Sequence, residues 1–222
     1  MVVESIQMEH ADDVITRLRS RQIADLERLY ELNGEPNVAI LEKHTTYLTP
    51  LLASFIKQSP FFMISTSDPD GNCDVSPKGD PAGAVQILDW HTIAIPDRPG
   101  NRRTDGHRNI LGNPHIGLIF VIPNVEETVR VNGRAFLTDD PELLDSMKVQ
   151  NRAPKLATIV EIDEVYVHCA RALLRAGIWK PETWPDPDTI PTLGAMIREQ
   201  KGLPPPDESQ GKRQEEYRSR LY

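Results

Sequence analysis

The sequence predicts a mainly β fold (α+β), in which six or seven short antiparallel strands form a barrel or sandwich with flanking helices. Between Phe61 and Cys169, apolar residues alternate with polar ones or form short runs of strand length. Tight turn sequences such as Asp68-Pro69-Asp70-Gly71-Asn72 separate these runs. Only one substantial helix pattern interrupts the strands, whereas a parallel sheet needs a crossover helix between successive strands.

The composition favours one main domain. A chain of 222 residues, of which 39% are hydrophobic, can build one core of ordinary size together with extensions. Its net charge of -8 argues against a general nucleic-acid surface. No apolar run is long enough to span a membrane, and the N-terminus lacks the pattern of a signal peptide, so we expect a cytoplasmic protein. Cys73 and Cys169 are too few for a disulfide framework and are expected to be reduced thiols.

Residues 1–48 are predicted to form an N-terminal helical extension. Apolar residues recur at roughly helical spacing across residues 12–32, with charged residues between them and Asn33-Gly34 as a stop signal. This pattern predicts one amphipathic helix. Because a single helix cannot bury its apolar stripe alone, we expect it to pack on the domain or on a partner subunit. A second helix is predicted over residues 49–58, with Thr49 as cap and Pro50 in the first turn.

The main domain is predicted at residues 49–180. Its strands are expected at residues 61–67, 73–78, 84–88, 92–95, 116–121, 129–137 and 160–169, and a short connecting helix at residues 141–148.

Proline becomes frequent after Trp179, which predicts an extended C-terminal arm at residues 181–222. Leu193, Met196 and Ile197 are expected to help anchor this arm on a partner subunit, with the residues after Pro206 left mobile. A disordered tail of no consequence is the alternative.

The stretch from Thr92 to Val121 carries the main functional signal, because it is predicted as strand, basic turn, helix and strand. Asn101 is expected to cap the helix and Gly112 to end it. Five cationic or titratable side chains gather there in an acidic chain: Arg98, Arg102, Arg103, His107 and Arg108. Guanidinium groups and the amides of a helix start suit a phosphate monoester. The alternative is a solvated turn that pairs with carboxylates such as Asp74, Asp97 and Asp105.

Four motifs follow one another between Phe61 and Trp179. They are Asp-Val-Ser-Pro-Lys-Gly at residues 74–79, Ile-Pro-Asp-Arg-Pro-Gly-Asn-Arg-Arg at 95–103, Arg-Val-Asn-Gly-Arg-Ala at 130–135 and His-Cys-Ala-Arg-Ala at 168–172. In this order the motifs resemble those of the pyridoxamine 5'-phosphate oxidase-like family, in a branch of uncharacterised bacterial flavoproteins. The resemblance implies an FMN-binding split β-barrel of six to seven strands, and a homodimer whose flavin site lies across the two-fold interface.

The same resemblance implies where FMN binds on one subunit. Lys78 matches the basic residue that touches the flavin and its phosphate. The three residues before Lys78 supply backbone contacts in the family, and they are Val75, Ser76 and Pro77 here. The family turn that grips the phosphate falls on Asn101, Arg102 and Arg103.

The resemblance implies that one strand reaches the flavin from the partner subunit. Thr128 and Arg130 lie on the strand that reaches the flavin there, and Thr128 stands where the family has a longer glutamine. Ile95-Pro96 replaces the family's aromatic residue and threonine, and proline has no N–H to donate. Trp179 is expected either to stack near the flavin ring or to plug one end of the barrel.

The resulting functional hypothesis is an FMN-dependent oxidoreductase that acts on an unidentified small molecule, with NAD(P)H as a candidate reductant and with no catalytic residue identified. The substrate-binding arginine and histidine motif of the true oxidases has no counterpart. A flavin-binding module or redox sensor without turnover is the alternative, and relatives of this barrel use deazaflavin or haem. His168 and Cys169 lack further ligands at chelating spacing, so no metal is expected.

Overall fold

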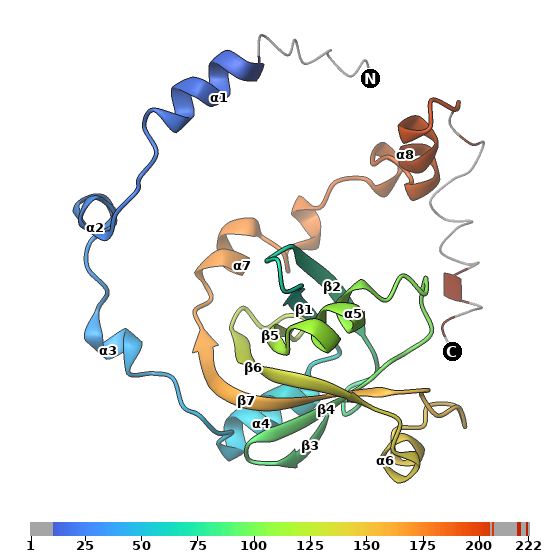
Figure 1. Cartoon of the computed structure of the whole chain (residues 1–222). Coiled ribbons are helices and arrows are strands. Elements are labelled where there is room, and N and C mark those ends of the chain that lie inside the picture. The colour runs from blue at the N-terminus through green and yellow to red at the C-terminus, as the bar shows by residue number, and fades with distance from the viewer. Residues whose placement is uncertain (1–10, 205, 207–216, 219–220, 222) are drawn as a thin grey trace. The chain divides into compact units, whose positions relative to one another are not determined.

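The computed structural model describes residues 11–204, 206, 217–218 and 221 (Figure 1). The chain divides into two compact units, Met1–Lys43 and His44–Tyr222. The described part of the first unit is helical, whereas the second unit contains the sheet and the helices around it.

The first unit corrects one prediction, because residues 12–32 do not form a single helix. Helix α1 spans Ala11–Arg19, α2 spans Leu26–Asn33 and a short α3 spans Val38–Leu41. The chain leaves α1 through a turn in which the amide of Gln22 donates to the carbonyl of Arg19 at 3.1 Å. Asp25 then starts α2, since its carboxylate accepts a 2.8 Å hydrogen bond from the amide of Arg28. The apolar period runs on across this break, which is why the pattern predicts one helix.

The second unit is built on one antiparallel sheet of seven strands, in the order β2-β1-β5-β6-β7-β4-β3. The strands are β1 (Phe61–Ser67), β2 (Cys73–Gly79), β3 (Gln86–Asp89), β4 (Thr92–Pro96), β5 (His115–Val121), β6 (Thr128–Thr138) and β7 (Ala157–His168). All seven predicted strands are present, and β7 begins three residues before its predicted start. The sheet is not closed, because β2 and β3 are its two edges. The predicted mainly β split barrel with flanking helices is therefore confirmed.

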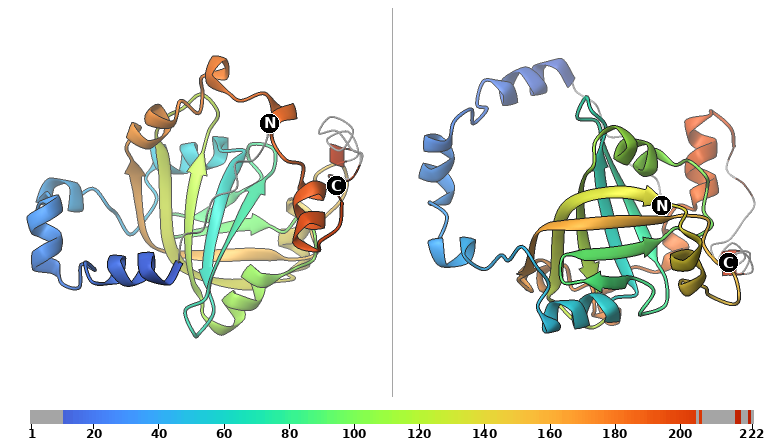
Figure 2. Two further views of the ribbon diagram at one scale, coloured as in Figure 1. Left: turned by 90° about the horizontal axis from the view of Figure 1, so that it is seen from above. Right: turned by 60° about the horizontal axis from the view of Figure 1, so that its bottom comes forward.

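The sheet is strongly curved (Figure 2). Strands β2 and β4 lie far apart in the sheet order, with four strands between them. Even so, Lys78 Nζ at the end of β2 lies 3.9 Å from Asp97 Oδ1, in the residue that follows β4. The sheet thus curls until its two sides approach each other, and this closure brings together segments that no strand pairing connects.

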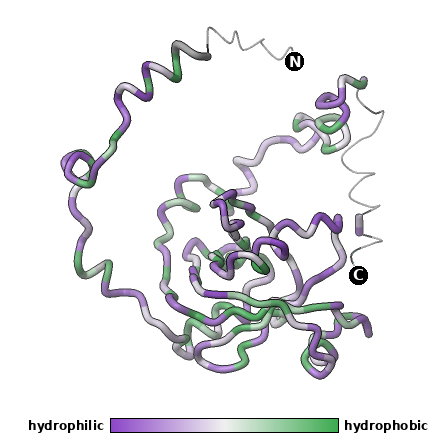
Figure 3. The backbone as a smooth tube through the Cα atoms, in the orientation of Figure 1, coloured by the Kyte–Doolittle hydropathy of each residue, from purple (hydrophilic) through white to green (hydrophobic). Residues whose placement is uncertain are grey.

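The core fills the inside of the curled sheet. Its fully buried residues include Phe120, Val131, Val160 and Val165, and α4 (Pro50–Gln58) adds Ile56 at one end. A second, smaller cluster packs α6 (Pro141–Ser146) against β4 and β7 through Leu144, Met147, Ala94, Ala157 and Ile159. Hydrophobic stretches follow the strands, whereas the loop before α5 is hydrophilic (Figure 3). Burial in two clusters therefore fixes β4 from both faces.

The remaining helices connect or follow the strands. Thr49 caps α4 as predicted, with its hydroxyl accepting from the amide of Leu52 at 3.4 Å. Helix α5 (Asp105–Gly112) joins β4 to β5, and α7 (Arg171–Ala176) follows β7. Among the described residues no helix is both long and apolar enough to cross a membrane.

The C-terminal arm contains two 3-10 turns, η1 (Pro181–Thr183) and η2 (Pro187–Thr189), and the helix α8 (Leu193–Gln200). The helical turns predicted around Leu193 and Ile197 are present in α8. Their apolar side chains are 47% and 39% exposed within this chain, so docking on a partner subunit stays a prediction. The segment predicted to be mobile after Pro206 lies outside the described residues, apart from residues 217, 218 and 221.

The longest ladder in the sheet pairs β6 with β7, and it requires glycine at one position. The register shifts between Asn132 and Gly133. A Cβ added to Gly133 would lie 2.1 Å from the carbonyl oxygen of Glu161. Real Cβ atoms essentially never come within 3.0 Å of another heavy atom in this way. The backbone of β7 would have to move to admit it.

We expect Gly133→Ala to lower the free energy of unfolding by more than about 2 kcal/mol, as a steric clash in a packed sheet does. Denaturant unfolding measures this change. Gly117→Ala is the matched control, because its Cβ would meet Asn132 Oδ1 at 3.4 Å, an ordinary contact distance. Equal losses in the two variants would contradict the steric argument.

Candidate functional site

The loop between β4 and α5, residues 98–104, is called the basic turn here. Its backbone is strained, because Arg102 and Thr104 adopt φ angles of 59° and 60°, in the left-handed region that non-glycine residues seldom occupy. The Asn101 side chain accepts a 3.0 Å hydrogen bond from the amide of Arg103. This local bond turns the chain so that two successive arginines are presented to solvent.

Asn101 is not the helix cap that the sequence predicts. Helix α5 begins at Asp105, so Thr104 occupies the cap position, and its side chain makes no capping hydrogen bond. Asn101 is too far back along the chain to reach the helix, and its side chain serves the turn instead. The first-turn amides of α5 consequently lack a side-chain cap, and amides of this kind suit an anion.

The cations of the basic turn have different roles. Arg103 is 79% exposed and pairs with Asp105, and this hydrogen-bonded carboxylate raises the pKa of Arg103. Arg102 is exposed as well, and the described residues contain no ion pair to it. Arg98 is partly buried, with its side chain only 12% exposed, and its Nε donates to Asp80 Oδ2 at 2.5 Å. Arg98 is therefore part of the framework, while Arg102 and Arg103 face the solvent.

Strand β2 supplies the second part of the site. Its side chains alternate, so Asp74, Ser76 and Lys78 lie on the more covered face and Val75 and Pro77 on the exposed one. The predicted run of four contact residues is thus divided between two faces. Helix α5 packs over the covered face, since a Cβ at Gly106 would lie 3.6 Å from both Asp74 Oδ2 and Thr66 Oγ1.

Asp97 joins the basic turn to β2. Its Oδ1 lies 3.9 Å from Lys78 Nζ and 3.5 Å from His107 Nε2. The His107 side chain is 18% exposed and that of Asp97 is 28% exposed, so the three groups form a partly buried cluster from β2, the end of β4 and α5. From the sequence, Asp97 and His107 are predicted only to lie near the arginines of the basic turn. Their meeting with Lys78 depends on the closure of the barrel, which local patterns do not reveal.

Of the two residues predicted on β6, Arg130 lies on the more exposed face of the same sheet, whereas Thr128 is buried. Pro77 pairs with Met63, Met63 with Ile119, and Ile119 with Arg130, so this cross-strand row directs its side chains to one face. The Arg130 guanidinium lies 5.2 Å from the ring centre of Tyr166 on that face. Val75, Pro77 and Arg130 therefore belong to one surface, and Ser76 and Lys78 to the other.

Thr128 and Trp179 lie near the start of β6. Thr128 is 4% exposed, and its hydroxyl has no hydrogen-bond partner within the described residues. Trp179 Nε1 donates to the carbonyl of Val125 at 3.0 Å, which fixes the ring beside the loop before β6. In the described part of the chain, no hydrogen bond or ion pair joins either residue to the basic turn. Among the same residues no group of three or more His, Cys, Asp or Glu is arranged to hold a metal.

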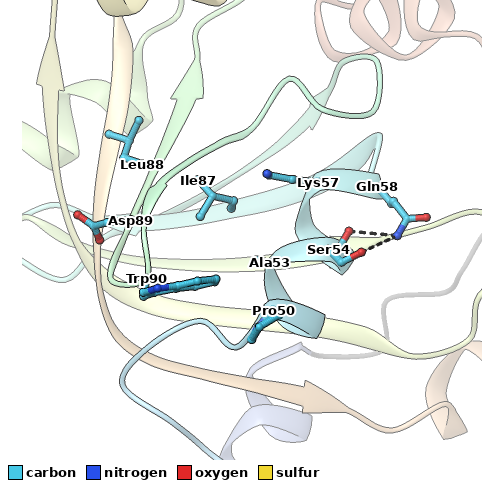
Figure 4. A pocket seen from close by; sticks show the side chains of 9 residues that line it. All are labelled: Pro50, Ala53, Ser54, Lys57, Gln58, Ile87, Leu88, Asp89 and Trp90. Atoms are coloured by element: carbon cyan, nitrogen blue, oxygen red, sulfur yellow. Dashed lines mark hydrogen bonds between the residues drawn. The ribbon is translucent and has the colours of Figure 1, made fainter.

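Hollows open on the described part of the second unit. One, of about 710 Å³, lies between α4 and the β3–β4 hairpin (Figure 4), and Pro50, Ala53, Ser54, Lys57, Gln58, Ile87, Leu88, Asp89 and Trp90 line it. None of the predicted cofactor-binding residues lines this hollow. A smaller one, of about 290 Å³, is lined by Ser65, Gly117 and Asn132 among others. These three residues share a cross-strand row with Val75, so the smaller hollow opens on the face that carries Arg130.

A family model described as pyridoxamine 5'-phosphate oxidase matches residues 48–169. Among solved structures, HupZ from Group A Streptococcus is 19% identical, with 53% of this chain and 91% of that chain covered and a TM-score of 0.43. An FMN-binding protein from Syntrophomonas wolfei is 13% identical, with coverages of 70% and 97% and a TM-score of 0.41. A pyridoxamine 5'-phosphate oxidase-related, FMN-binding protein from Nostoc punctiforme is 12% identical, with coverages of 54% and 84% and a TM-score of 0.41. No curated protein matches this chain.

The strained backbone of the basic turn leads to a prediction about Thr104. We expect Thr104→Gly to keep or raise the stability of the protein, by up to about 1 kcal/mol, because glycine adopts a φ of 60° without steric cost. Thr49→Gly is the matched control, since Thr49 also precedes a helix but has a φ of -78° and caps it. That variant should lose a few tenths of a kcal/mol to about 1 kcal/mol. Thermal unfolding compares the two, and a greater loss for Thr104→Gly would contradict the strain assignment.

Proposed function

The chain belongs to the pyridoxamine 5'-phosphate oxidase family, and we propose that it is a flavoprotein that binds FMN at the basic turn and acts as an FMN-dependent oxidoreductase. The observation that carries this proposal is the arrangement of Arg102 and Arg103, which are exposed on a strained turn that leads directly into a helix start without a side-chain cap. Exposed guanidinium groups beside free helix amides favour an anion with several oxygens, such as a phosphate monoester.

The phosphate end of FMN would be held by Arg102, Arg103 and the first-turn amides of α5, with Asn101 shaping the turn. Lys78 belongs to the same side of the barrel, because Asp97 connects it to the segment that enters the turn. An ammonium group there favours an anion on the cofactor, whether the phosphate or the negative charge of a reduced flavin.

The ring end would lie along the edge strand β2. Only β1 pairs with β2 in this sheet, so the other backbone edge of β2 retains donors and acceptors for a planar polar ring, except at Pro77, which has no N–H. Bound FMN supplies hydride and electron transfer at its ring, and the protein's part is to position the ring and to tune it through hydrogen bonds. Val75 and Ser76 are the neighbouring residues that would offer main-chain contacts.

Thr128 and Arg130 would reach the ring from a second subunit, and Trp179, beside the loop before β6, would lie near the ring. Arg130 shares a sheet face with Val75 and Pro77, so a partner placed against this face brings its own Arg130 towards β2. The buried Thr128 hydroxyl lacks a partner within the described chain, and a polar cofactor atom would supply one. This arrangement supports a homodimer with a small-molecule cleft at its interface.

The first test is the affinity for FMN, measured by quenching of flavin fluorescence. We expect Arg102→Ala and Arg103→Ala each to weaken binding roughly ten- to a hundredfold, because a charge-assisted hydrogen bond contributes about 1.5 to 3 kcal/mol. Arg108→Ala is the control, as this exposed arginine lies on α5 beyond the basic turn. Unchanged affinity in the Arg102→Ala, Arg103→Ala double variant would rule out this phosphate site.

The absorbance spectrum of the purified protein tests the cofactor class and anaerobic mixing with NADPH or NADH tests the reaction. Flavin bands that bleach on mixing and recover with an acceptor over many cycles are the expected result. Flavin bands that never turn over would support a binding module or redox sensor, a deazaflavin spectrum would replace FMN, and a Soret band would point to haem.

The oligomeric state is tested by light scattering. We expect a dimer for the unaltered protein and a shift towards monomer for Val75→Glu, because Val75 is 62% exposed on the proposed interface and a buried charge there would lack a partner. Leu51→Glu is the matched control, since Leu51 is 84% exposed on α4, outside that face. A monomer that retains full FMN occupancy would overturn the shared site.

A further inference from the structure

The basic turn is held at both of its ends. At its start, the amide of Asp97 donates to the carbonyl of Leu156 at 3.0 Å, and Arg98 is bonded to Asp80. At its far end, α5 is tied to β1 because Asn109 Nδ2 donates to Thr66 Oγ1 at 3.1 Å. Between these ends the side chains of residues 99–104 are exposed. The shape of the turn thus depends on its two attachments more than on its own packing.

The attachment through Arg98 is largely shielded from solvent. The Arg98 side chain is 12% exposed and that of Asp80 is 8% exposed. Arg98 Nη2 also donates to the carbonyl of Met147 at 3.0 Å, next to the small core cluster around α6. One guanidinium therefore connects the entry of the turn to the segment after β2 and to the segment after α6. A planar fork with several donors can hold this geometry, which a single ammonium cannot.

The strained backbone of the basic turn depends on the attachment through Arg98. Left-handed φ angles at Arg102 and Thr104 cost free energy, and such conformations persist only when the surrounding structure holds them. If the entry of the turn were released, the two residues would relax to ordinary backbone angles. The Arg102 and Arg103 side chains would then point elsewhere.

We propose that Asp80 and Arg98 are positioning residues for the anion site, so that their partly buried ion pair sets the affinity for the cofactor phosphate although neither side chain contacts it. This inference rests on the proposed binding of FMN at the basic turn. It extends that proposal by assigning a role to a carboxylate, which simple electrostatics would count as unfavourable next to an anion.

The direction in which Asp80→Asn changes the affinity for FMN distinguishes positioning from simple electrostatics. Asp80→Asn removes a negative charge near an anion site, so electrostatics alone predicts tighter binding. Positioning predicts the opposite, a loss of roughly fivefold or more in FMN affinity, because misdirected guanidinium groups forfeit part of their charge-assisted hydrogen bonds. Fluorescence titration of the full-length protein with FMN gives the answer. Equal or tighter binding by Asp80→Asn would overturn the proposal.

Asp74→Asn is the matched control. The Asp105 carboxylate is the main cause that raises the pKa of Arg103, and the Asp74 carboxylate contributes to the same shift. Within the described residues, Asp74 is not part of the hydrogen bonds that attach the two ends of the turn. The same change of one charge should therefore leave FMN binding at least as tight as in the unaltered protein. If both variants weaken FMN binding to the same degree, the effect is not specific to the ion pair, and the proposal fails.

Two further variants test whether a loss of affinity comes from misfolding or from the loss of a charge. Asp80→Asn leaves Arg98 partly buried without its carboxylate, so the double variant Asp80→Asn, Arg98→Gln removes both charges and is expected to fold and still bind FMN weakly. Arg98→Lys keeps the charge but not the fork, and should weaken FMN binding as well; full affinity in that variant would contradict positioning.

A rescue variant tests the strain directly. Adding Thr104→Gly to Asp80→Asn should recover part of the lost affinity, because one of the two strained residues then needs no support. Absence of any recovery would count against the mechanism. If the unaltered protein does not bind FMN, the proposed function itself fails; if Arg102→Ala weakens binding and Asp80→Asn does not, only this inference fails.

Discussion

The pairing of β6 with β7 is the constraint on which the rest of the molecule depends. These two strands lie in the middle of the sheet, with β5, β1 and β2 attached on one side and β4 and β3 on the other. Their twist and the register shift at Gly133 set how far the two sides curl towards each other. The approach of Lys78 to Asp97 follows from that curvature. A polar cluster at the open seam of the barrel is therefore specified by apolar packing and strand register far from it.

The parts that the sequence predicts well are those with a local cause. Apolar runs such as Ile93–Ile95, bounded by turn residues, give the strands, and Thr49-Pro50 gives the start of α4. The parts that it misses have long-range causes. Nothing local distinguishes the partly buried Arg98 from the exposed Arg102, because the difference is made by Asp80 and by the carbonyl of Met147. A continuous apolar period likewise conceals the break that Asp25 makes by capping a second helix.

The predicted cofactor residues divide into two surfaces, and this division has a simple origin in strand geometry. Neighbouring residues of β2 point to opposite faces, so one short motif serves both the covered side with Ser76 and Lys78 and the exposed side with Val75 and Pro77. A ligand bound at the edge of β2 could be enclosed on both faces of the strand only if another subunit covered the exposed face. In the proposed function, one short segment would therefore contribute both to the phosphate site and to a subunit contact.

The free edge of β2 has one more consequence, for the chain before any ligand arrives. An unpaired strand edge invites pairing with the edge of another molecule, which is a route to aggregation. Strand β2 carries the features that discourage this: Pro77 interrupts the row of amide donors, and Asp74 and Lys78 place charges along the strand. The residues that leave this edge unpaired, where the proposed cofactor would bind, also make it a poor template for a foreign strand.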